Sequence, residues 1–327
     1  MTHSAPAATL ERATLTPTPK LIALDMDGTL LGLDARVSPR NLAALQRAQA
    51  AGILIVIATG RRHCYAMRAL RNLGLSPKTL IVSSNGAVTR TIDAHLLHRT
   101  FLPIPTATWL CSHLEGFRET LVLTFDRVGP DGEDTRGALV VERLDHLHNS
   151  IARWMEVNAP YIAHINPLEL SLAALSPDEA PIQAMLCGTI PHMRRAEARL
   201  LQHEGVTSDH SDHAALPPQT SRVHTHSVAI HRTEYPDRDL CIVDILPAGC
   251  SKGHAITRLA AGHSIPRAQV LAIGDNWNDV SMLEAAGQAA LMSNAPADLL
   301  AHAATRPWQL LPAHHEDGVA HLLESFL

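Results

Sequence analysis

Short, unbroken apolar runs alternate with stretches of helical spacing over the first part of the chain. Three of these runs are predicted to be strands: residues 20–24, 53–58 and 80–83. Two helices are predicted between them: residues 39–51 and 63–73. Ser38 is a suitable N-cap for the first helix, and Pro39 takes its first position. Because buried parallel strands are continuous apolar runs, this pattern predicts a βαβαβ series in a parallel sheet.

The same alternation returns near the C-terminus, with a helix predicted at residues 252–261 and a strand at 270–273. The region between about residues 92 and 240 is more irregular and is rich in proline and histidine. Its apolar runs and helical stretches predict strands at 121–125, 137–141, 182–187 and 228–231 and helices at 149–157 and 192–204. We therefore expect a different, α+β architecture in this middle region.

These patterns predict two domains, which the length of 327 residues also favours. Residues 20–91 and 241–327 are expected to form a Rossmann-like, doubly wound α/β core, with residues 92–240 inserted as an α+β domain. Residues 1–19, rich in Ala, Thr and Pro, are expected to be a disordered leader. Only 3% of the residues are aromatic, which suits aliphatic α/β layers better than an aromatic-rich β-sandwich.

Composition narrows the expected partners and compartment. The formal net charge of −5 gives no support for a nucleic-acid partner, which would favour a basic surface. The five cysteines are scattered without CxxC spacing, so neither a disulfide framework nor a structural zinc site is indicated. No apolar run reaches the roughly 18 residues of a membrane span, and the N-terminus lacks the pattern of a signal peptide. A cytoplasmic protein with no membrane partner, monomeric or homodimeric, is expected.

Polar residues fall where the predicted parallel strands end. They are Asp25 and Asp27 in DMDGT, Thr59 in ATGRR, Lys252 in GCSKGHA, and Asp275, Asn278 and Asp279 in GDNWNDVSM. Open α/β sheets bind ligands at the carboxyl ends of their strands. Carboxylates there can bind Mg²⁺ or attack phosphorus, a hydroxyl and backbone amides can hold phosphoryl oxygens, and a lysine can neutralise charge. Each motif alone has a plainer interpretation as a turn, a helix cap or a solvated charge; the set at strand ends favours phosphoryl transfer.

In this set of motifs the chain resembles the haloacid dehalogenase superfamily of phosphohydrolases, and within it the Cof-like, class IIB group. The resemblance covers roughly residues 20–90 and 241–304, including LIALDMDGTLL, ILIVIATGRR, IVSSNGA, GCSKGHAI and LAIGDNWNDVSMLEAAG. Little room lies between Asp25 and Thr59, whereas a whole domain fits between Thr59 and Lys252. The inserted domain is therefore predicted to be a class II cap, which would set substrate choice and exclude water.

The resemblance implies a role for each motif residue. Asp25 would attack phosphorus, and Asp27 would act as general acid and base while its backbone carbonyl ligates Mg²⁺. Asp275 would be a direct metal ligand, with Asp279 supporting the metal through water. The remaining residues would bind the phosphoryl group or balance its charge: Thr59, Gly60 and Lys252, with Arg61 or Arg62 placed to contact substrate. Asn278 would hydrogen-bond to the phosphate or to Lys252. Thr29 is expected to brace the DMDGT loop.

These features predict a Mg²⁺-dependent phosphomonoester hydrolase acting on a small phosphorylated metabolite, such as a sugar phosphate or a phosphorylated cofactor. A phosphomutase or a sugar-specific phosphatase can share the same core and cap. A phospho-accepting regulator without turnover is a third possibility, which Asp27 argues against. The histidines of the segment 209–232 could form a second metal site, but a solvated loop followed by a strand is favoured. Trp277 is expected to pack beside its loop.

Overall fold

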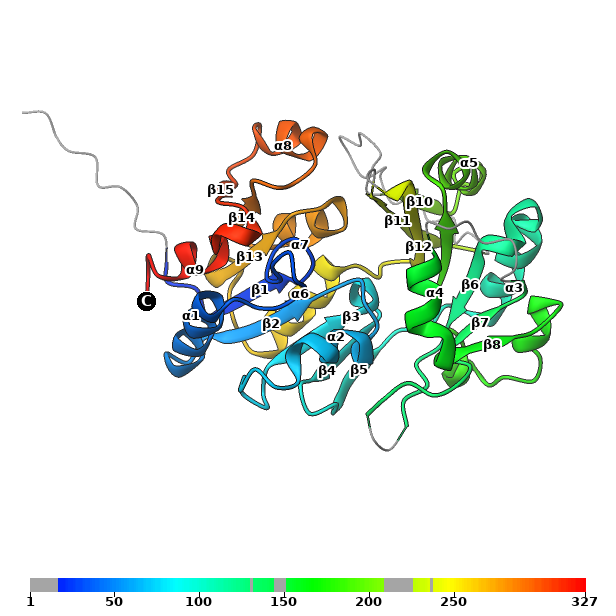
Figure 1. Ribbon diagram of the computed structural model, residues 1–327, viewed down its shortest axis with the longest axis horizontal. Helices are drawn as coiled ribbons and strands as arrows, with labels where there is room; N and C mark the ends of the chain where they lie inside the picture. The colour runs from blue at the N-terminus through cyan, green and yellow to red at the C-terminus, as the bar shows by residue number, and fades with distance from the viewer. Residues whose placement is uncertain (1–16, 130–131, 144–150, 209–225, 236–237) are drawn as a thin grey trace, which may run out of the picture.

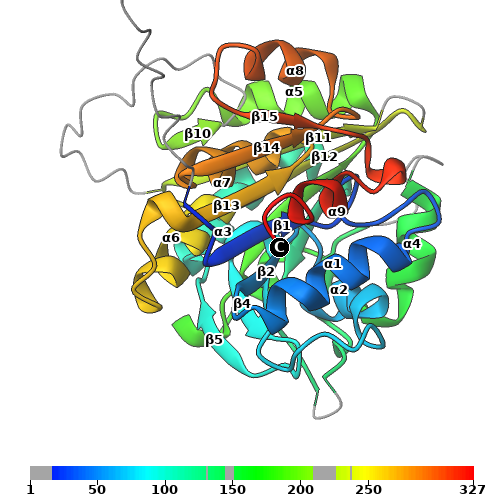
Figure 2. The same ribbon diagram turned by 90° about the vertical axis from the view of Figure 1, so that its left-hand side faces the viewer.

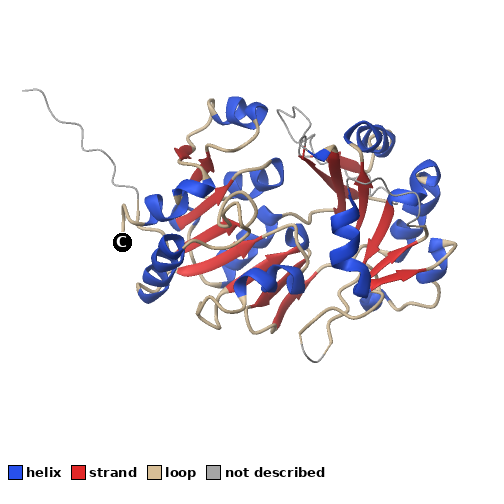
Figure 3. Cartoon of the chain, viewed as in Figure 1, coloured by secondary structure: helices blue, strands red, loops and turns tan. Residues whose placement is uncertain are grey.

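The computed structural model describes residues 17–129, 132–143, 151–208, 226–235 and 238–327. It consists of two β-sheets, each with helices packed against it, which lie at opposite ends of the molecule (Figures 1 and 3). Most of the predicted leader, residues 1–16, lies outside the described residues. In the part of the chain that is described, no helix is both long and apolar enough to span a membrane.

The first sheet contains the predicted parallel strands. Its order is β15-β14-β13-β1-β2-β3-β4-β5. The strands are β1 (Leu21–Asp25), β2 (Leu54–Ala58), β3 (Leu80–Ser83), β4 (Val88–Thr91), β5 (Leu96–Arg99), β13 (Val270–Gly274), β14 (Gln288–Met292) and β15 (Gln309–Leu311). Strand β1 lies between β2 and β13 and is parallel to both. Sequence segments from the two ends of the chain therefore meet at the centre of one sheet.

Helices cover both faces of this first sheet, because successive side chains of a strand point to opposite faces. Ile22 and Leu24 of β1 pack in one apolar cluster, and Leu21 and Ala23 pack in another. The first cluster lies under α1 (Pro39–Ala50), α2 (His63–Leu70) and α9 (Gly318–Leu323), which are seen in front of the sheet in Figure 2. The second lies under α6 (Lys252–Gly262), α7 (Val280–Ala285) and α8 (Ala297–Ala303). This three-layer arrangement confirms the expected doubly wound core.

The second sheet has the order β10-β11-β12-β9-β6-β7-β8. Its strands are β6 (Leu121–Thr124), β7 (Leu139–Val141), β8 (Ile162–His164), β9 (Gln183–Gly188), β10 (Val206–Ser208), β11 (Val228–Tyr235) and β12 (Leu240–Pro247). Helices α3 (Ile104–His113) and α5 (Ile190–Leu200) pack on one face, and α4 (Ala152–Asn158) contributes to the opposite face. This mixed sheet with its helices is the inserted α+β unit, which we call the cap.

The sheets shift the expected edges of the two units. β5 pairs with β4, so the core sheet continues to Arg99, beyond the expected edge at residue 91. β12 pairs with β9 and β11, so residues 240–247 belong to the cap sheet, although we expected the core to resume at 241. The apolar run LCIVDILP resembles a buried core strand, and its sequence alone does not reveal which sheet it joins.

The predicted start of the first helix is confirmed. The Ser38 hydroxyl accepts a hydrogen bond from the Asn41 N–H and caps α1, with Pro39 in the first turn as expected. All five cysteines are free and buried. The second helix is shorter than predicted and ends at Leu70.

Candidate active site

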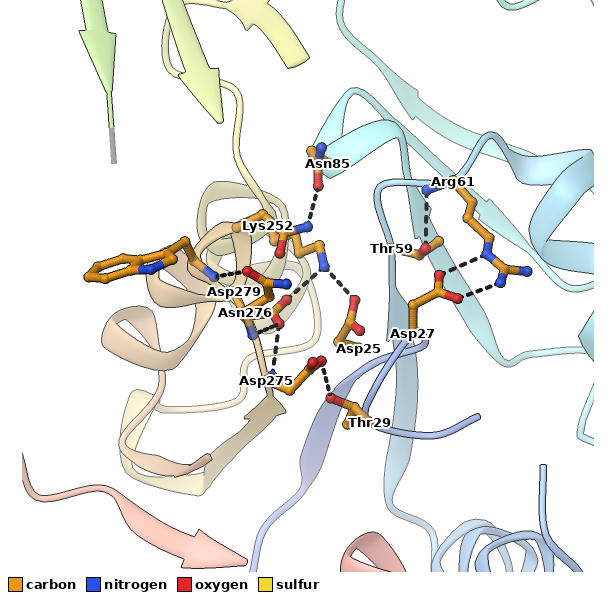
Figure 4. A network of polar contacts seen from close by, with 12 residues as sticks. Asp25, Asp27, Thr29, Thr59, Arg61, Asn85, Lys252, Asp275, Asn276 and Asp279 are labelled. Atoms are coloured by element: carbon orange, nitrogen blue, oxygen red, sulfur yellow. Dashed lines mark hydrogen bonds and ion pairs between the residues drawn. The ribbon is translucent and has the colours of Figure 1, made fainter. Parts of the chain in front are cut away.

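The predicted motif residues gather at the carboxyl ends of β1, β2 and β13 (Figure 4). Asp25 is the last residue of β1, and Asp275 follows the last residue of the neighbouring strand β13. Both side chains are nearly buried, with exposed fractions of 5% and 6%. Parallel pairing places these two carboxylates side by side, although 250 positions separate them in the sequence numbering.

Three carboxylates form a compact acidic cluster at these strand ends. Oxygen atoms of Asp25, Asp275 and Asp279 all lie within 4.8 Å of one another, and among the described residues this is the one group of acidic, histidine or cysteine side chains that could hold a metal ion. Lys252, which is fully buried, lies against the cluster. Its Nζ donates to Asp25 Oδ1 at 2.5 Å and to Asp279 Oδ1 at 2.7 Å. The lysine thus holds two of the three carboxylates in place.

The cluster carries more negative than positive charge. Burial raises the pKa of Asp25 to about 7, and the neighbouring Asp279 carboxylate adds to the rise. Burial and the Asp25 carboxylate also raise the pKa of Asp275. Burial alone would lower the pKa of Lys252, but Asp25 and Asp279 together raise it, so its ammonium group stays charged. A further cation at the cluster would relieve the remaining repulsion between the carboxylates.

The DMDGT loop fixes the position of Asp275. Gly28 has a φ of +84°, and a Cβ atom there would lie only 2.2 Å from Asp275 Oδ2, so no other residue fits without displacing the carboxylate. The Thr29 hydroxyl donates to Asp275 Oδ1 at 2.9 Å, which confirms the expected bracing role. Asn294 was not predicted; its Nδ2 donates to the Gly28 carbonyl at 2.9 Å and holds the loop from the other side.

Asp279 is positioned by the start of the helical segment that carries it. Its Oδ2 accepts hydrogen bonds of 3.0 Å from the backbone N–H groups of Asp275 and Asn276. Asn276 and Asp279 thus form a capping box at the 3₁₀ helix η9 (Trp277–Asp279). One oxygen of Asp279 therefore satisfies the backbone, while the other accepts from Lys252.

Asp27 lies apart from the acidic cluster. Its side chain is 47% exposed and forms a two-point ion pair with Arg61, in which Arg61 Nε donates to Oδ2 at 2.7 Å and Arg61 Nη2 donates to Oδ1. Figure 4 shows this pair beside Thr59, on the opposite side of Asp25 from Asp275. The two aspartates of DMDGT thus have different surroundings: Asp25 faces Lys252, and Asp27 faces Arg61.

The predicted phosphate-binding residues lie around the turn at residues 84–86, which is not among the predicted site residues. The Thr59 hydroxyl accepts from the Arg61 N–H at 3.1 Å, and the Thr59 carbonyl accepts from the Asn85 N–H at 3.1 Å. Asn278 Nδ2 donates to Asn85 Oδ1 at 3.1 Å. Asn85 therefore links the Thr59 and Asn278 segments. The available signal was its position in SSNGA at a strand end, the same signal that marks Thr59.

Two features outside the cluster resolve earlier expectations. Trp277 packs beside its loop as expected, with Nε1 donating to Asp298 Oδ2 at 3.2 Å and its ring near His302. His226 precedes β11 and stacks on Trp109, with ring centroids 5.3 Å apart. Of the other histidines on which a second metal site would depend, His231 lies on β11 and is buried, whereas His210, His213 and His224 lie outside the described residues.

Comparison with known proteins identifies the family of this chain. The family model for haloacid dehalogenase-like hydrolases matches residues 22–126 and 227–323, which include every motif described above. The chain belongs to this family. "Phosphatase YwpJ" of Bacillus subtilis is 31% identical over 94% of this chain and 100% of its own length. A second relative from Bacillus subtilis, named 5-amino-6-(5-phospho-D-ribitylamino)uracil phosphatase YwtE, is 26% identical over 94% of this chain and 98% of its own.

Solved structures agree with this assignment. A haloacid dehalogenase-like hydrolase from B. subtilis superposes with a TM-score of 0.70 at 25% identity and covers 94% of this chain and 100% of its own. The expected Cof-like phosphatase of the haloacid dehalogenase superfamily, with its α/β core and cap, is therefore confirmed.

The acidic cluster suits a metal ion of this family. Its donors are carboxylate oxygens, which Mg²⁺ prefers, and the buried carboxyls with raised pKa values lack sufficient compensating charge from Lys252 alone. The Asp27 side chain is not part of the cluster.

Proposed function

We propose that this phosphatase hydrolyses phosphomonoesters of a small metabolite with Mg²⁺, and that Asp25 is its nucleophile. The observation that carries the proposal is the position of Asp25: it is buried at the centre of the sheet edge and shares the acidic cluster with Asp275. Lys252 contacts Asp25 Oδ1 at 2.5 Å. Mg²⁺ held by Asp25, Asp275 and the Asp27 backbone carbonyl, with Asp279 supporting it through water, would neutralise charge on the transferring phosphoryl group.

The residues of the chain divide the remaining tasks. Asp25 attacks phosphorus and becomes an aspartyl-phosphate as the ester oxygen leaves. Lys252 fixes the orientation of the attacking carboxylate and balances charge on the phosphoryl oxygens. Thr59, the Gly60 amide and the Asn278 amide bind those oxygens from the side of β2 and η9.

Asp27 handles the proton. It protonates the leaving oxygen and then removes a proton from the water that hydrolyses the aspartyl-phosphate. In the structure its carboxylate is held by Arg61, so it has to exchange this ion pair for the substrate's leaving group. Arg61 is then free to contact the substrate from the same position.

The cap is the source of substrate choice in this proposal. Tyr235 is the last residue of β11 and is 39% exposed. Side chains alternate along a strand, so Tyr235 points to the same face as His231 and Thr233, which is opposite to the face covered by helices. β11 contacts η9, the core segment that carries Asn278 and Asp279. An aromatic side chain there suits a substrate with a planar ring. The name of the relative YwtE, a phosphatase of a ribitylamino-uracil phosphate, supports the same class of metabolite.

The experiment is phosphate release from a panel of phosphorylated metabolites, measured with Mg²⁺ and with EDTA, for the wild type and for D25N. We expect turnover with Mg²⁺ that EDTA abolishes and that D25N lacks. Substantial Mg²⁺-dependent activity in D25N would refute the role of Asp25. Isomerised product without phosphate release would instead indicate a phosphomutase, and a phosphoenzyme that persists for minutes would indicate a regulator.

A further inference from the structure

The turn formed by the 3₁₀ segment η1 (Ser84–Gly86) is the point where the motif segments of the core meet. Asn85 is 1% exposed and adopts a left-handed φ of +49°. The Ser84 N–H donates to the Arg61 carbonyl at 2.9 Å, and the Asn85 N–H donates to that of Thr59. A Cβ atom at Gly86 would lie 2.3 Å from the carbonyl oxygen of Ser251, the residue before Lys252. The turn is thus packed against both segments.

The side chain of Asn85 extends these contacts to the cap. Its Oδ1 accepts from Asn278 Nδ2 at 3.1 Å, and its Nδ2 donates to Asp244 Oδ2 at 2.9 Å. Asp244 lies on β12 of the cap sheet and is 8% exposed. A hydrogen-bonded chain, Asp244–Asn85–Asn278, therefore runs from the cap sheet to the loop that carries Asp279.

The position of Asp244 within β12 directs it toward the core. Its neighbours Val243 and Ile245 pack under α3 and α5, so Asp244 points to the opposite face. On that face it is directly across from His231 of β11. Burial raises the pKa of Asp244 to about 6, while His231 and the hydrogen bond from Asn85 oppose the rise. Asp244 is therefore mainly ionised at about pH 8.

An ionised carboxylate can only accept hydrogen bonds, and this constrains the whole chain. Asp244 requires the NH₂ group of Asn85, which turns the Asn85 oxygen toward Asn278. That oxygen in turn requires the NH₂ group of Asn278 and fixes the orientation of its amide. An amide at position 244 would lack this selectivity, because it can donate as well as accept.

We propose that Asp244 and Asn85 are positioning residues, through which the cap sets the orientation of Asn278 for binding the phosphoryl group. The inference rests on the proposed function, which assigns Asn278 to the phosphoryl oxygens. It gives the cap a second task besides substrate choice. A cap that moves away from the core would break the Asp244–Asn85 bond and weaken phosphate binding.

The test is a double-mutant cycle between D244N and N85A, assayed at about pH 8 with p-nitrophenyl phosphate and with inorganic phosphate as inhibitor. Each single variant should raise KM and the phosphate Ki about tenfold, with a smaller change in kcat, because a charge-assisted hydrogen bond is lost. The double variant should be no worse than the poorer single one, because both changes break the same chain. D239N is the matched control, since Asp239 is a cap carboxylate that accepts from the Ile190 N–H instead; it should behave as wild type.

Several outcomes would overturn the proposal. One is a folded D244N whose phosphate Ki stays within twofold of the wild type, and another is a double variant whose losses multiply. If D244N does not fold by circular dichroism, the cycle between N85A and N278A decides, and multiplied losses there refute the chain. D25N is assayed alongside: an active D25N would refute the proposed function, whereas an inactive D25N with a wild-type-like D244N would refute only the present inference.

Discussion

Gly28→Ala tests whether the DMDGT loop fixes the acidic cluster. The substitution adds one methyl group at a φ of +84°, where its Cβ would lie 2.2 Å from Asp275 Oδ2 and 2.7 Å from the carboxyl carbon. Two separate penalties follow. The left-handed backbone is strained for alanine, and the Asp275 carboxylate has to move away from Thr29 and Asp25.

The structure offers a control that separates these penalties. Gly52, after α1, has a similar φ of +81°, but a Cβ atom there would have no neighbour within 4 Å. The left-handed conformation costs an alanine about 1–2 kcal/mol, which both variants share. The clash at Gly28 adds about 1–3 kcal/mol, as overpacking does in a buried site. G28A should therefore lose about 2–5 kcal/mol of unfolding free energy, and G52A about 1–2 kcal/mol.

Urea unfolding monitored by circular dichroism measures the two losses, and phosphate release measures activity. Because misplacement of a reacting group by about 1 Å can cost about 100-fold in rate, kcat/KM of G28A should fall by about that factor. Its Mg²⁺ requirement should rise as well, while G52A keeps wild-type kinetics. Equal stability and equal activity of G28A and G52A would refute the close packing of Gly28 against Asp275.

Two further predictions follow from buried charges. K252M should lower the unfolding free energy by about 3–5 kcal/mol in metal-free buffer, because Asp25 and Asp279 lose their buried partner; urea unfolding with and without Mg²⁺ measures the loss, which added Mg²⁺ should reduce. Burial and the nearby charge of Arg90 lower the pKa of His63 from 6.5 to about 4. Between these two pH values His63 is protonated in the unfolded chain and neutral in the native chain. The contribution of neutral His63 to the unfolding free energy is therefore complete above pH 6.5 and decreases as the pH falls toward 4, by about 2 kcal/mol at pH 5. Between pH 8 and pH 5, H63L should lose less unfolding free energy than the wild type. An equal loss in both proteins would contradict the assignment.

The core was predictable because its signals are local. Each buried parallel strand is a continuous apolar run, and the polar residue that ends it marks the functional edge of the sheet. Asp25, Thr59 and Asp275 could thus be placed together without knowledge of the strand order. The expected N-cap at Ser38 depends on the same kind of short-range chemistry.

The cap was less predictable because several of its strands are short and its pairings are long-range. β8 and β10 span three residues each, too few to show alternation, and α3 has apolar residues on more than one face. The bond between Asn85 and Asp244 joins residues 159 positions apart. Asp244 sits within an apolar strand, and only the pairing of β12 with β11 and β9 reveals which way it points.

The ion pair between Asp27 and Arg61 was also beyond the sequence. Both residues were expected in the site, but as separate groups acting on the substrate. Their two-point contact depends on the side-by-side placement of β1 and β2, in which Asp25 is paired with Ala58. The two residues can be identified from the sequence, whereas their ion pair depends on the register of β1 and β2.

Direct identification of the phosphorylated residue tests the central claim. The enzyme is mixed with Mg²⁺ and a phosphorylated metabolite that it hydrolyses in the panel. The reaction is quenched in acid within milliseconds, and the protein is digested and analysed by mass spectrometry. We expect a phosphoryl group on Asp25 in the peptide containing DMDGT, and none in D25N treated in the same way. A phosphoryl group on any other residue, or steady turnover by D25N, would contradict it.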